Sequence, residues 1–259
     1  MTSLKKWIED YCPVDDVGVK QSRILLTGSV GAGKSSYVNT INSIFRGHVT
    51  SQAGIGSAEN SLTTIYRCHQ VRNGSTYLKF RLCDTPGLDD AHGIGEGDLE
   101  AILDGQVPDR YTFHPFSPIT TDNPEYIKSP SINDKIHCAA FFIDGGSVDV
   151  MNDSILSKFK LLQKLANQRG VPQVILLTKV DQIGLEVEDN LPNLLHSSKV
   201  VYVVDQVAQL TGLPRGHVLP VKNYEKETEL NETVDKYALL SLEQMLQSAD
   251  DFMYGILDA

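Results

Sequence analysis

A glycine-rich segment near the N-terminus contains the residue types and spacing that most clearly indicate chemistry. Residues 28–35 read GSVGAGKS and match the phosphate-binding pattern GxxxxGK[ST] at every fixed position. Its three glycines carry no side chains, so successive backbone N–H groups can approach a polyphosphate closely. Lys34 would supply positive charge to the β- and γ-phosphates, and the Ser35 hydroxyl would ligate the accompanying magnesium ion. The segment predicts binding of a nucleoside di- or triphosphate.

The flanking residues distinguish a phosphate loop from an ordinary glycine-rich turn. The apolar run Ile24-Leu25-Leu26 precedes the segment and predicts a buried strand. Directly after it, Val38, Ile41, Ile44 and Phe45 recur at helical spacing. A strand before and a helix after are the context that this pattern requires, and the helix dipole would add to anion binding.

A second segment, Asp84-Thr85-Pro86-Gly87, follows a predicted strand and could complete the metal site. Asp84 can hold the magnesium shell, and the N–H of Gly87 can reach a γ-phosphate. Pro-Gly is also a common turn pair, so the position after the strand gives the segment its weight. Thr63 or Thr64, in the loop before the predicted hairpin, is the candidate second magnesium ligand, and both are also good strand starters.

A lysine and an aspartate after a later strand indicate which base is bound. Thr178, Lys179 and Asp181 directly follow the apolar run 174–177. One carboxylate can accept from two adjacent donors, and guanine presents an N1–H beside an amino group where adenine does not. Lys179 would lay its stem along the purine ring. Asn223, after the last predicted strand, could close over the base. At another place in the chain, the same residues would be an ordinary helix-start turn.

The overall composition excludes some classes of partner. The 259 residues are 41% hydrophobic and 22% charged, which is ordinary for a globular domain. Lys and Arg number 23 against 33 Asp and Glu, and the formal charge of −10 would repel nucleic acid and anionic lipid. No signal-peptide core or membrane span is recognisable, which predicts a cytoplasmic protein. The four cysteines lack the spacing of bridges or zinc ligands and are expected to be free thiols.

Strand-like and helix-like segments alternate, which predicts an α/β fold with a mostly parallel sheet. An amphipathic helix with Ser3 as N-cap begins the chain, and the turn pair Asn73-Gly74 predicts one antiparallel hairpin. The expected hairpin strands are 63–71 and 77–83, the further strands 136–143, 174–177 and 218–221, and the later helices about 155–166, 194–210 and 234–247.

One nucleotide-binding domain with short appendages accounts for the length of the chain. Residues 1–20 would form the N-terminal helix and linker, and residues 21–250 the domain itself. A proline-rich stretch near 105–134 has no clear period and is expected to be an ordered surface insertion. Residues 251–259 would form a C-terminal tail.

With these motifs in order, the chain resembles the Ras-like GTPase superfamily and, more closely, the interferon-induced protein 44 family. The resemblance implies a three-layer Ras-like P-loop GTPase domain, GTP or GDP with Mg²⁺ as ligands, and a part in the interferon-linked antiviral immune response. Thr178 departs from the superfamily pattern, which usually has asparagine there. The segments that carry the resemblance are Ser22-Arg23-Ile24-Leu25-Leu26, Gly33-Lys34-Ser35-Ser36, Phe45-Arg46-Gly47-His48-Val49-Thr50, Asp109-Arg110-Tyr111, Ile127-Lys128-Ser129-Pro130-Ser131, Asp134-Lys135-Ile136-His137-Cys138 and Ala249-Asp250-Asp251-Phe252.

The residues expected to bind nucleotide or metal lie in these motifs and in the polar stretch before the hairpin. Ser35, Thr63 and Asp84 are the expected magnesium ligands. The full set is Gly28, Val30, Gly31, Ala32, Gly33, Lys34, Ser35, Ser36, Thr63, Asp84, Gly87, Thr178, Lys179, Asp181 and Asn223.

Hydrolysis requires a group that orients the attacking water. Ras-like enzymes have glutamine directly after the DxxG glycine, where this sequence has Leu88, and a hydrocarbon cannot orient water. Asp89, Asp90 and His92 are the nearby candidates, although an exposed loop is the simpler explanation for them. The sequence therefore predicts slow GTP hydrolysis, with dimerisation across the nucleotide face as one way to stimulate it.

Two functional classes stay open. A GTPase switch would order the segments 47–64 and 88–97 on the γ-phosphate and recruit a protein effector. A non-hydrolysing module would instead use the nucleotide as a structural ligand. An ATP-using P-loop protein is a further alternative, against which the residues at 178–181 argue.

Overall fold

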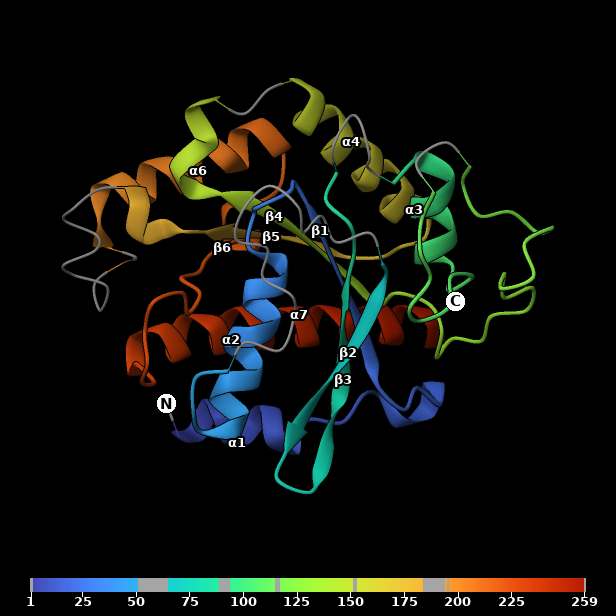
Figure 1. Cartoon of the computed structure of the whole chain (residues 1–259), viewed down its shortest axis with the longest axis horizontal. Helices are drawn as coiled ribbons and strands as arrows, with labels where there is room; N and C mark the ends of the chain where they lie inside the picture. The colour runs from blue at the N-terminus through green and yellow to red at the C-terminus, as the bar shows by residue number, and fades with distance from the viewer. Residues whose placement is uncertain are drawn as a thin grey trace.

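The computed structural model describes residues 2–50, 65–88, 94–114, 117–150, 153–183, 194 and 196–258. Its centre is a six-stranded sheet with the order β2-β3-β1-β4-β5-β6 (Figure 1). β2 and β3 are antiparallel, and every other neighbouring pair is parallel. The predicted α/β fold with a mostly parallel sheet and one antiparallel hairpin is confirmed. The strands are β1 (Ser22–Gly28), β2 (Arg67–Asn73), β3 (Thr76–Asp84), β4 (Cys138–Asp144), β5 (Gln173–Thr178) and β6 (Val218–Pro220).

Helices cover both faces of the sheet, so the molecule has three layers. α1, α2 and α7 lie on one face, and α3, α4 and α6 lie on the other (Figure 1). The helices are α1 (Thr2–Asp10), α2 (Lys34–Arg46), α3 (Glu96–Leu103), α4 (Asp153–Gln168), α6 (Ser198–Thr211) and α7 (Glu232–Leu257), with the short 3-10 helices η1 (Asp15–Val17), η2 (Gly145–Val150), η3 (Val180–Ile183) and η5 (Arg215–His217).

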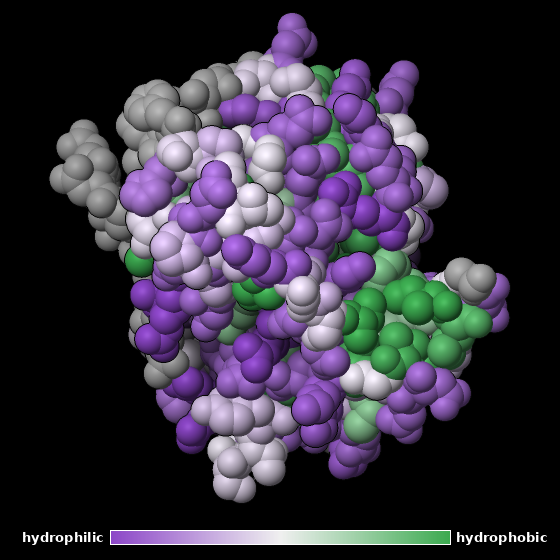
Figure 2. All heavy atoms as spheres, turned by 90° about the vertical axis from the view of Figure 1, so that its right-hand side faces the viewer, coloured by the Kyte–Doolittle hydropathy of each residue, from purple (hydrophilic) through white to green (hydrophobic). Residues whose placement is uncertain are grey.

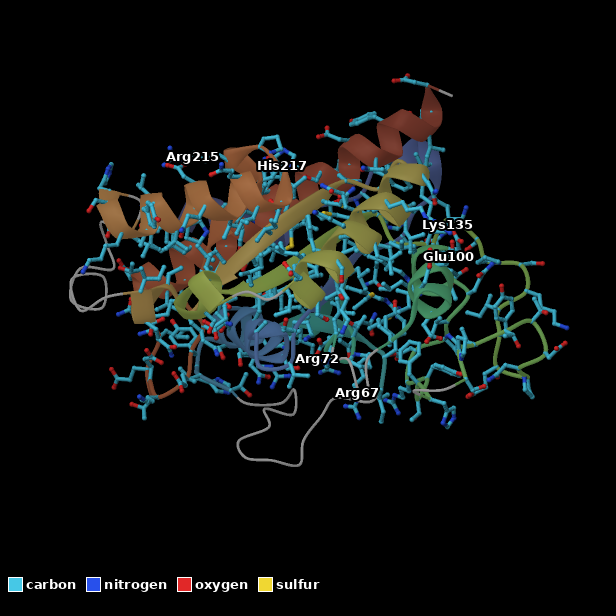
Figure 3. All side chains as sticks on the ribbon, turned by 90° about the horizontal axis from the view of Figure 1, so that it is seen from above. Arg67, Arg72, Glu100, Lys135, Arg215 and His217 are labelled. Carbon is cyan, nitrogen blue, oxygen red and sulfur yellow. The ribbon has the colours of Figure 1, made fainter. Side chains whose placement is uncertain are left out.

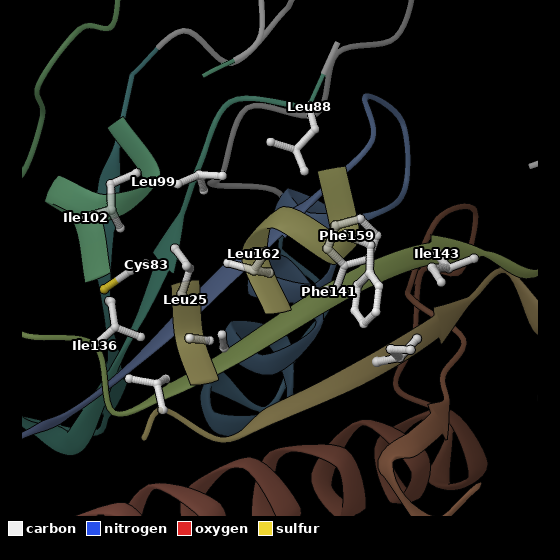
Figure 4. Packing of buried hydrophobic residues seen from close by; sticks show 14 of the residues in the cluster. Leu25, Cys83, Leu88, Leu99, Ile102, Ile136, Phe141, Ile143, Phe159 and Leu162 are labelled. Carbon is white, nitrogen blue, oxygen red and sulfur yellow. The ribbon is translucent and has the colours of Figure 1, made fainter. Parts of the chain in front are cut away.

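The central strands have continuous apolar runs in their middle because both of their faces are covered. Leu25 of β1 points into the core under α3, α4 and α6, whereas Leu26 points into the core under α2 and α7. Figure 4 shows the first of these cores, where the rings of Phe141 and Phe159 meet edge to face with centroids 5.1 Å apart. The close packing on both faces makes the sheet a rigid support for the loops at its ends.

The two ends of the chain differ from the sequence-based expectation. α1 begins at Thr2, so Ser3 lies inside the helix and its predicted N-cap role is wrong. α7 continues to Leu257, ten residues beyond the predicted end. Tyr11, just after α1, donates a hydrogen bond to Asp250 of α7 (2.6 Å), and Met253 is fully buried. α7 therefore packs on the domain as far as Met253, beside the N-terminal segment, whereas Tyr254, Ile256 and Leu257 of its last turn are exposed.

The two ends of the segment 105–134 lie against each other. Gly105 has φ +76°, and a Cβ there would lie 2.5 Å from the carbonyl carbon of Asp134. Part of this segment runs along the outer edge of the hairpin, where Tyr66 N donates to Tyr111 O and Arg110 N donates to Tyr66 O, each at 2.8 Å. The segment therefore covers backbone groups beside the edge strand β2, which would otherwise be open to another chain.

Charged side chains lie at both edges of the sheet. Figure 3 labels Arg67 and Arg72 at the β2 edge of the sheet and Arg215 and His217 at the β6 edge. The face that carries the C-terminal end of α7 is mostly hydrophilic apart from one apolar area (Figure 2). Among the described residues, no helix is both long enough and apolar enough to cross a membrane.

Candidate functional site

The carboxyl ends of four parallel strands meet at one edge of the sheet. β1 is followed by the glycine-rich segment, β3 ends at Asp84, β4 at Asp144 and β5 at Thr178. β1 lies between β3 and β4, so the order of the strands reverses at β1. Open α/β sheets bind ligands in the crevice that forms at such a reversal. The fold thus brings together motifs that lie far apart in the sequence.

The glycine-rich segment wraps around the side chain of Lys34. Gly33, with φ +89°, is the N-cap of α2, and Lys34 is its first residue. Lys34 Nζ donates to the carbonyl oxygens of Gly28 and Ser29, each at 3.0 Å. Burial of the ammonium group lowers the pKa of Lys34 to about 8, although the nearby Asp84 carboxylate opposes the shift. A poorly hydrated cation is therefore held at the N-terminus of a helix, which suits a polyphosphate.

Ser35 and Asp84 lie side by side at the start of α2. Ser35 Oγ donates to Asp84 Oδ2 at 2.6 Å, and Asp84 is 2% exposed. Burial raises the pKa of Asp84, while the Lys34 ammonium group acts in the opposite direction. Asp84 Oδ1 is buried and has no hydrogen-bond partner in the described part of the chain. A buried carboxylate oxygen without a partner is costly, and a hard cation such as Mg²⁺ would satisfy it, so this oxygen set fits magnesium.

The turn after β3 lies against the glycine-rich segment. A Cβ on Gly87 would come within 2.8 Å of the backbone nitrogen of Val30, so only glycine allows this approach. Leu88 N donates to Gly28 O at 3.0 Å, and the Leu88 side chain is buried in the core, as Figure 4 shows. The residue after the DxxG glycine therefore faces the protein interior.

Thr178 at the end of β5 and Asn223 after β6 contact the backbone of the same segment. Thr178 Oγ1 donates to Ala32 O at 2.8 Å, and Asn223 Nδ2 donates to Gly33 O at 3.0 Å. Asn223 is predicted to close over the base, and its amide group contacts the backbone that precedes α2. The hydroxyl of Thr178 anchors the loop from the position where the superfamily pattern has asparagine.

The predicted base-binding residues Lys179 and Asp181 each lie beside a side chain of opposite charge. Lys179 has φ +52°, which is uncommon for a non-glycine residue, and its Nζ donates to Asp144 Oδ2 at 2.6 Å. Asp181 Oδ2 lies 3.9 Å from Lys222 Nζ, which also pairs with Glu227 at 2.7 Å. Burial raises the pKa of Asp181, and the positive charge of Lys222 opposes that shift.

Most of the predicted site residues therefore lie at the same edge of the sheet. Thr63, Thr64, Asp89, Asp90 and His92 lie outside the described residues. The sequence did not point to Asp144 and Lys222, which contact the predicted base-binding residues Lys179 and Asp181. Asp144 could have been found by its position, because it directly follows the apolar run of β4 and so lies at the carboxyl end of a parallel strand. The Lys222 interaction with Asp181 had no comparable signal.

Several known proteins are similar to this chain. Human interferon-induced protein 44-like is 43% identical over 250 residues, which cover 95% of this chain and 55% of the relative. Interferon-induced protein 44 from Homo sapiens and Mus musculus is 37% and 33% identical over 254 residues, which cover 97% of this chain and 57% and 60% of those relatives. This chain thus spans little more than half the length of the curated relatives.

Two further comparisons complete the findings. No family model matches the sequence. A crystal structure titled "a probable GTP-binding protein engB" aligns with 89% of this chain and 99% of its own, at 11% identity and a TM-score of 0.44. The relatives in sequence decide the family: over nearly its whole length, this chain is homologous to interferon-induced protein 44 and interferon-induced protein 44-like.

Proposed function

We propose that this chain binds guanine nucleotides together with Mg²⁺ and acts as a nucleotide-dependent switch with slow GTP hydrolysis. The observation that carries the proposal is the cluster of buried Lys34, buried Asp84 and half-buried Ser35 at the start of α2. It joins a poorly hydrated cation, a hydroxyl and a carboxylate oxygen without a hydrogen-bond partner in the described part of the chain. Apolar residues would fill such a position at lower cost, so the cluster is best explained by a charged ligand.

Within this proposal, each polar group has its own task. Backbone N–H groups of residues 30–36 and Lys34 bind the phosphates, and the α2 dipole adds to their attraction. Ser35 and Asp84 would hold Mg²⁺, which would supply positive charge that neutralises the phosphates. Gly87 offers its N–H to the γ-phosphate. A residue larger than glycine would not fit at position 87, because its Cβ would clash with Val30.

Selection of guanine is assigned to Asp181. Its carboxylate is partly buried and can accept hydrogen bonds from the N1–H and the amino group of guanine together. Adenine has neither a hydrogen on N1 nor an amino group at C2, so both of these hydrogen bonds would be lost. Lys179, held by Asp144, would place its stem against the purine ring.

The slow rate follows from the direction of the Leu88 side chain. Leu88 is buried in the core and carries no group that could orient water. Turnover would therefore need a group from elsewhere, such as Asp89, Asp90, His92 or a second copy docked across the nucleotide face. From the names of the relatives, we further propose that this chain is induced by interferon and takes part in antiviral immunity.

Titration calorimetry with GTP, GDP and ATP in the presence of Mg²⁺ tests the binding proposal. We expect GTP and GDP to bind and ATP to bind at least about 100-fold more weakly, because a buried carboxylate without its donor partners is costly. Ser35→Ala should weaken Mg²⁺-dependent binding, whereas Ser157→Ala on the exposed face of α4 is the matched control. Tighter binding of ATP than of GTP would refute the proposal.

Phosphate release separates a switch from a non-hydrolysing module. The rate should exceed that of Ser35→Ala and should rise per chain with protein concentration if dimerisation stimulates it. Turnover at the Ser35→Ala level throughout, with guanine binding intact, would favour the module.

A further inference from the structure

Two cysteines face each other across the β2–β3 hairpin. Cys68 of β2 is the direct partner of Cys83 of β3, and both are free thiols. Both side chains belong to the core under α3 and α4, where Figure 4 shows Cys83 beside Ile102 and Ile136. The proposed nucleotide chemistry uses neither thiol.

The hydrogen-bond pattern of the edge strand fixes the type of this pair. Cys68 N points away from β3, because it donates to Asp109 Oδ1 at 2.7 Å. An antiparallel pair whose N–H groups point outward is a non-hydrogen-bonded pair, in which the Cα atoms lie about 4.5 Å apart. Disulfides need Cα separations of about 4.4 to 6.8 Å, so the backbone can accept a bond here without moving far.

The two thiols differ in their surroundings. Cys68 is 6% exposed and lies on the edge strand, whereas Cys83 is fully buried on the inner strand. Arg23 Nη1 donates to Cys68 Sγ at 3.9 Å, and a guanidinium group favours the thiolate form. The hydrogen bond with Cys83 and the charge of Arg23 hold the pKa of Cys68 below its usual value, although burial opposes them. Cys68 is therefore the thiol that an oxidant would meet first.

We propose that Cys68 and Cys83 form a reversible intrachain disulfide and that peroxides are the oxidant class. The Cys68 thiolate attacks one oxygen of hydrogen peroxide, the O–O bond breaks, and the products are Cys68 sulfenic acid and hydroxide. Cys83 sulfur then attacks the Cys68 sulfur, and the S–O bond breaks. The sulfenic hydroxyl leaves as water with the proton of Cys83. In total, two thiols and one peroxide give one disulfide and two waters. A dithiol reverses the bond by exchange.

The position of the bond gives it a consequence for the hairpin. β3 passes from Cys83 directly to Asp84, and Arg67 next to Cys68 is the partner of Asp84 in the ladder. A disulfide would tie both strands together one residue before the proposed magnesium ligand. The bond itself does not depend on nucleotide, so it can be tested whether or not the chain binds GTP.

Mass spectrometry of the folded chain tests the proposal. Cys12→Ser first removes the exposed cysteine and its intermolecular disulfides. The protein is treated with hydrogen peroxide under native conditions, and the remaining thiols are alkylated after unfolding. We expect a loss of about 2 Da, two fewer alkylated thiols and reversal by dithiothreitol. Trypsin cleaves after Arg67, Arg72 and Arg81, so peptide 68–72 should stay joined to the peptide that begins at Leu82.

Matched variants identify the reacting pair. Cys138→Ser removes a buried cysteine that faces Ile24 rather than another thiol, and it should leave the oxidation unchanged. In Cys83→Ser, Cys68 should stop at the sulfenic acid and be labelled by dimedone. Three alkylated thiols after peroxide treatment of folded Cys12→Ser protein, or a disulfide that includes Cys138, would overturn the proposal. Both outcomes are measured on the Cys12→Ser protein, whose one substitution lies at an exposed position outside the core.

Discussion

The candidate site has two ends with similar charges in different surroundings. The proposed phosphate end consists of Lys34, Ser35 and Asp84, and the proposed base end consists of Asp144, Lys179, Asp181 and Lys222. At the phosphate end, Lys34 and Asp84 are almost fully buried, and Lys34 is bonded to backbone carbonyl oxygens. At the base end, the Lys179–Asp144 pair leaves 35% and 22% of its side chains exposed. The first arrangement is set by the backbone of the loop, whereas the second depends on contacts between side chains.

This difference assigns separate tasks to the two ends. A buried cation and carboxylate have already lost most of their hydration, so a phosphate and a metal ion that bind there meet little further desolvation cost. Partly exposed ion pairs contribute little stability and can exchange partners with a ligand. We therefore expect the phosphate end to supply most of the affinity and the base end to supply the choice of nucleotide.

The largest effect is expected from Lys34→Ala. Removal of the buried cation should weaken GTP and GDP binding by about 4 kcal/mol, or about 1000-fold, because charge-assisted contacts to the phosphates are lost. The thermal midpoint should change little, since the side chain is costly to bury when no ligand is bound. Calorimetry and thermal unfolding give the two values, and Lys160→Ala on the exposed face of α4 is the matched control. Full affinity in Lys34→Ala would contradict the division between the two ends.

Asp181→Asn should change the choice of base and retain binding of the phosphates. Asparagine has one oxygen where aspartate has two, so it cannot accept both hydrogen bonds from guanine. GDP affinity should therefore fall about 100-fold. Xanthine has a carbonyl group in place of the guanine amino group, and the amide N–H can donate to it. Affinity for xanthosine diphosphate should rise correspondingly. Competition against a fluorescent nucleotide measures both, and an equal loss for the two bases would indicate general damage.

The affinity for nucleotide should fall as the pH rises above about 8. The pKa of Lys34 in the free protein is about 8 because of burial, and the bound phosphates would raise it. Binding therefore takes up a proton once the pH exceeds the pKa of the free protein. Between pH 7 and pH 9 the affinity should decrease about tenfold, since one proton must be added per site. Calorimetry in buffers of different ionisation enthalpy measures the uptake, and a flat profile with no uptake would show that Lys34 stays charged.

The sequence around residues 28–35 was sufficient to predict the strand that precedes this segment and the helix that follows it. A loop that surrounds a polyphosphate needs glycines, a lysine and a hydroxyl at fixed distances along the chain, so the pattern at 28–35 carries the geometry with it. The apolar runs before it and at 174–177 likewise predicted buried parallel strands, because such strands are covered on both faces.

Contacts between distant segments were beyond the same reasoning. Asn223 lies in a polar stretch after β6, and its hydrogen bond to Gly33 depends on how β6 is placed beside β5. The extension of α7 had the same cause: Asp250 and Asp251 interrupt the apolar pattern, but Tyr11 binds Asp250 and the core takes up Met253. Tertiary contacts decided both positions, and local pattern does not encode them.

The smallest effect is expected from Asp144→Asn, which tests whether the ion pair at the base end guides Lys179. The substitution keeps the size of the side chain and removes the charge that holds Lys179 Nζ at 2.6 Å. Because the pair is partly exposed, guanine affinity should fall only about fivefold, or about 1 kcal/mol. Asp205→Asn breaks the more exposed pair with Arg215 and should leave binding unchanged. A loss as large as that of Lys34→Ala would mean that the base end supplies affinity as well as selection.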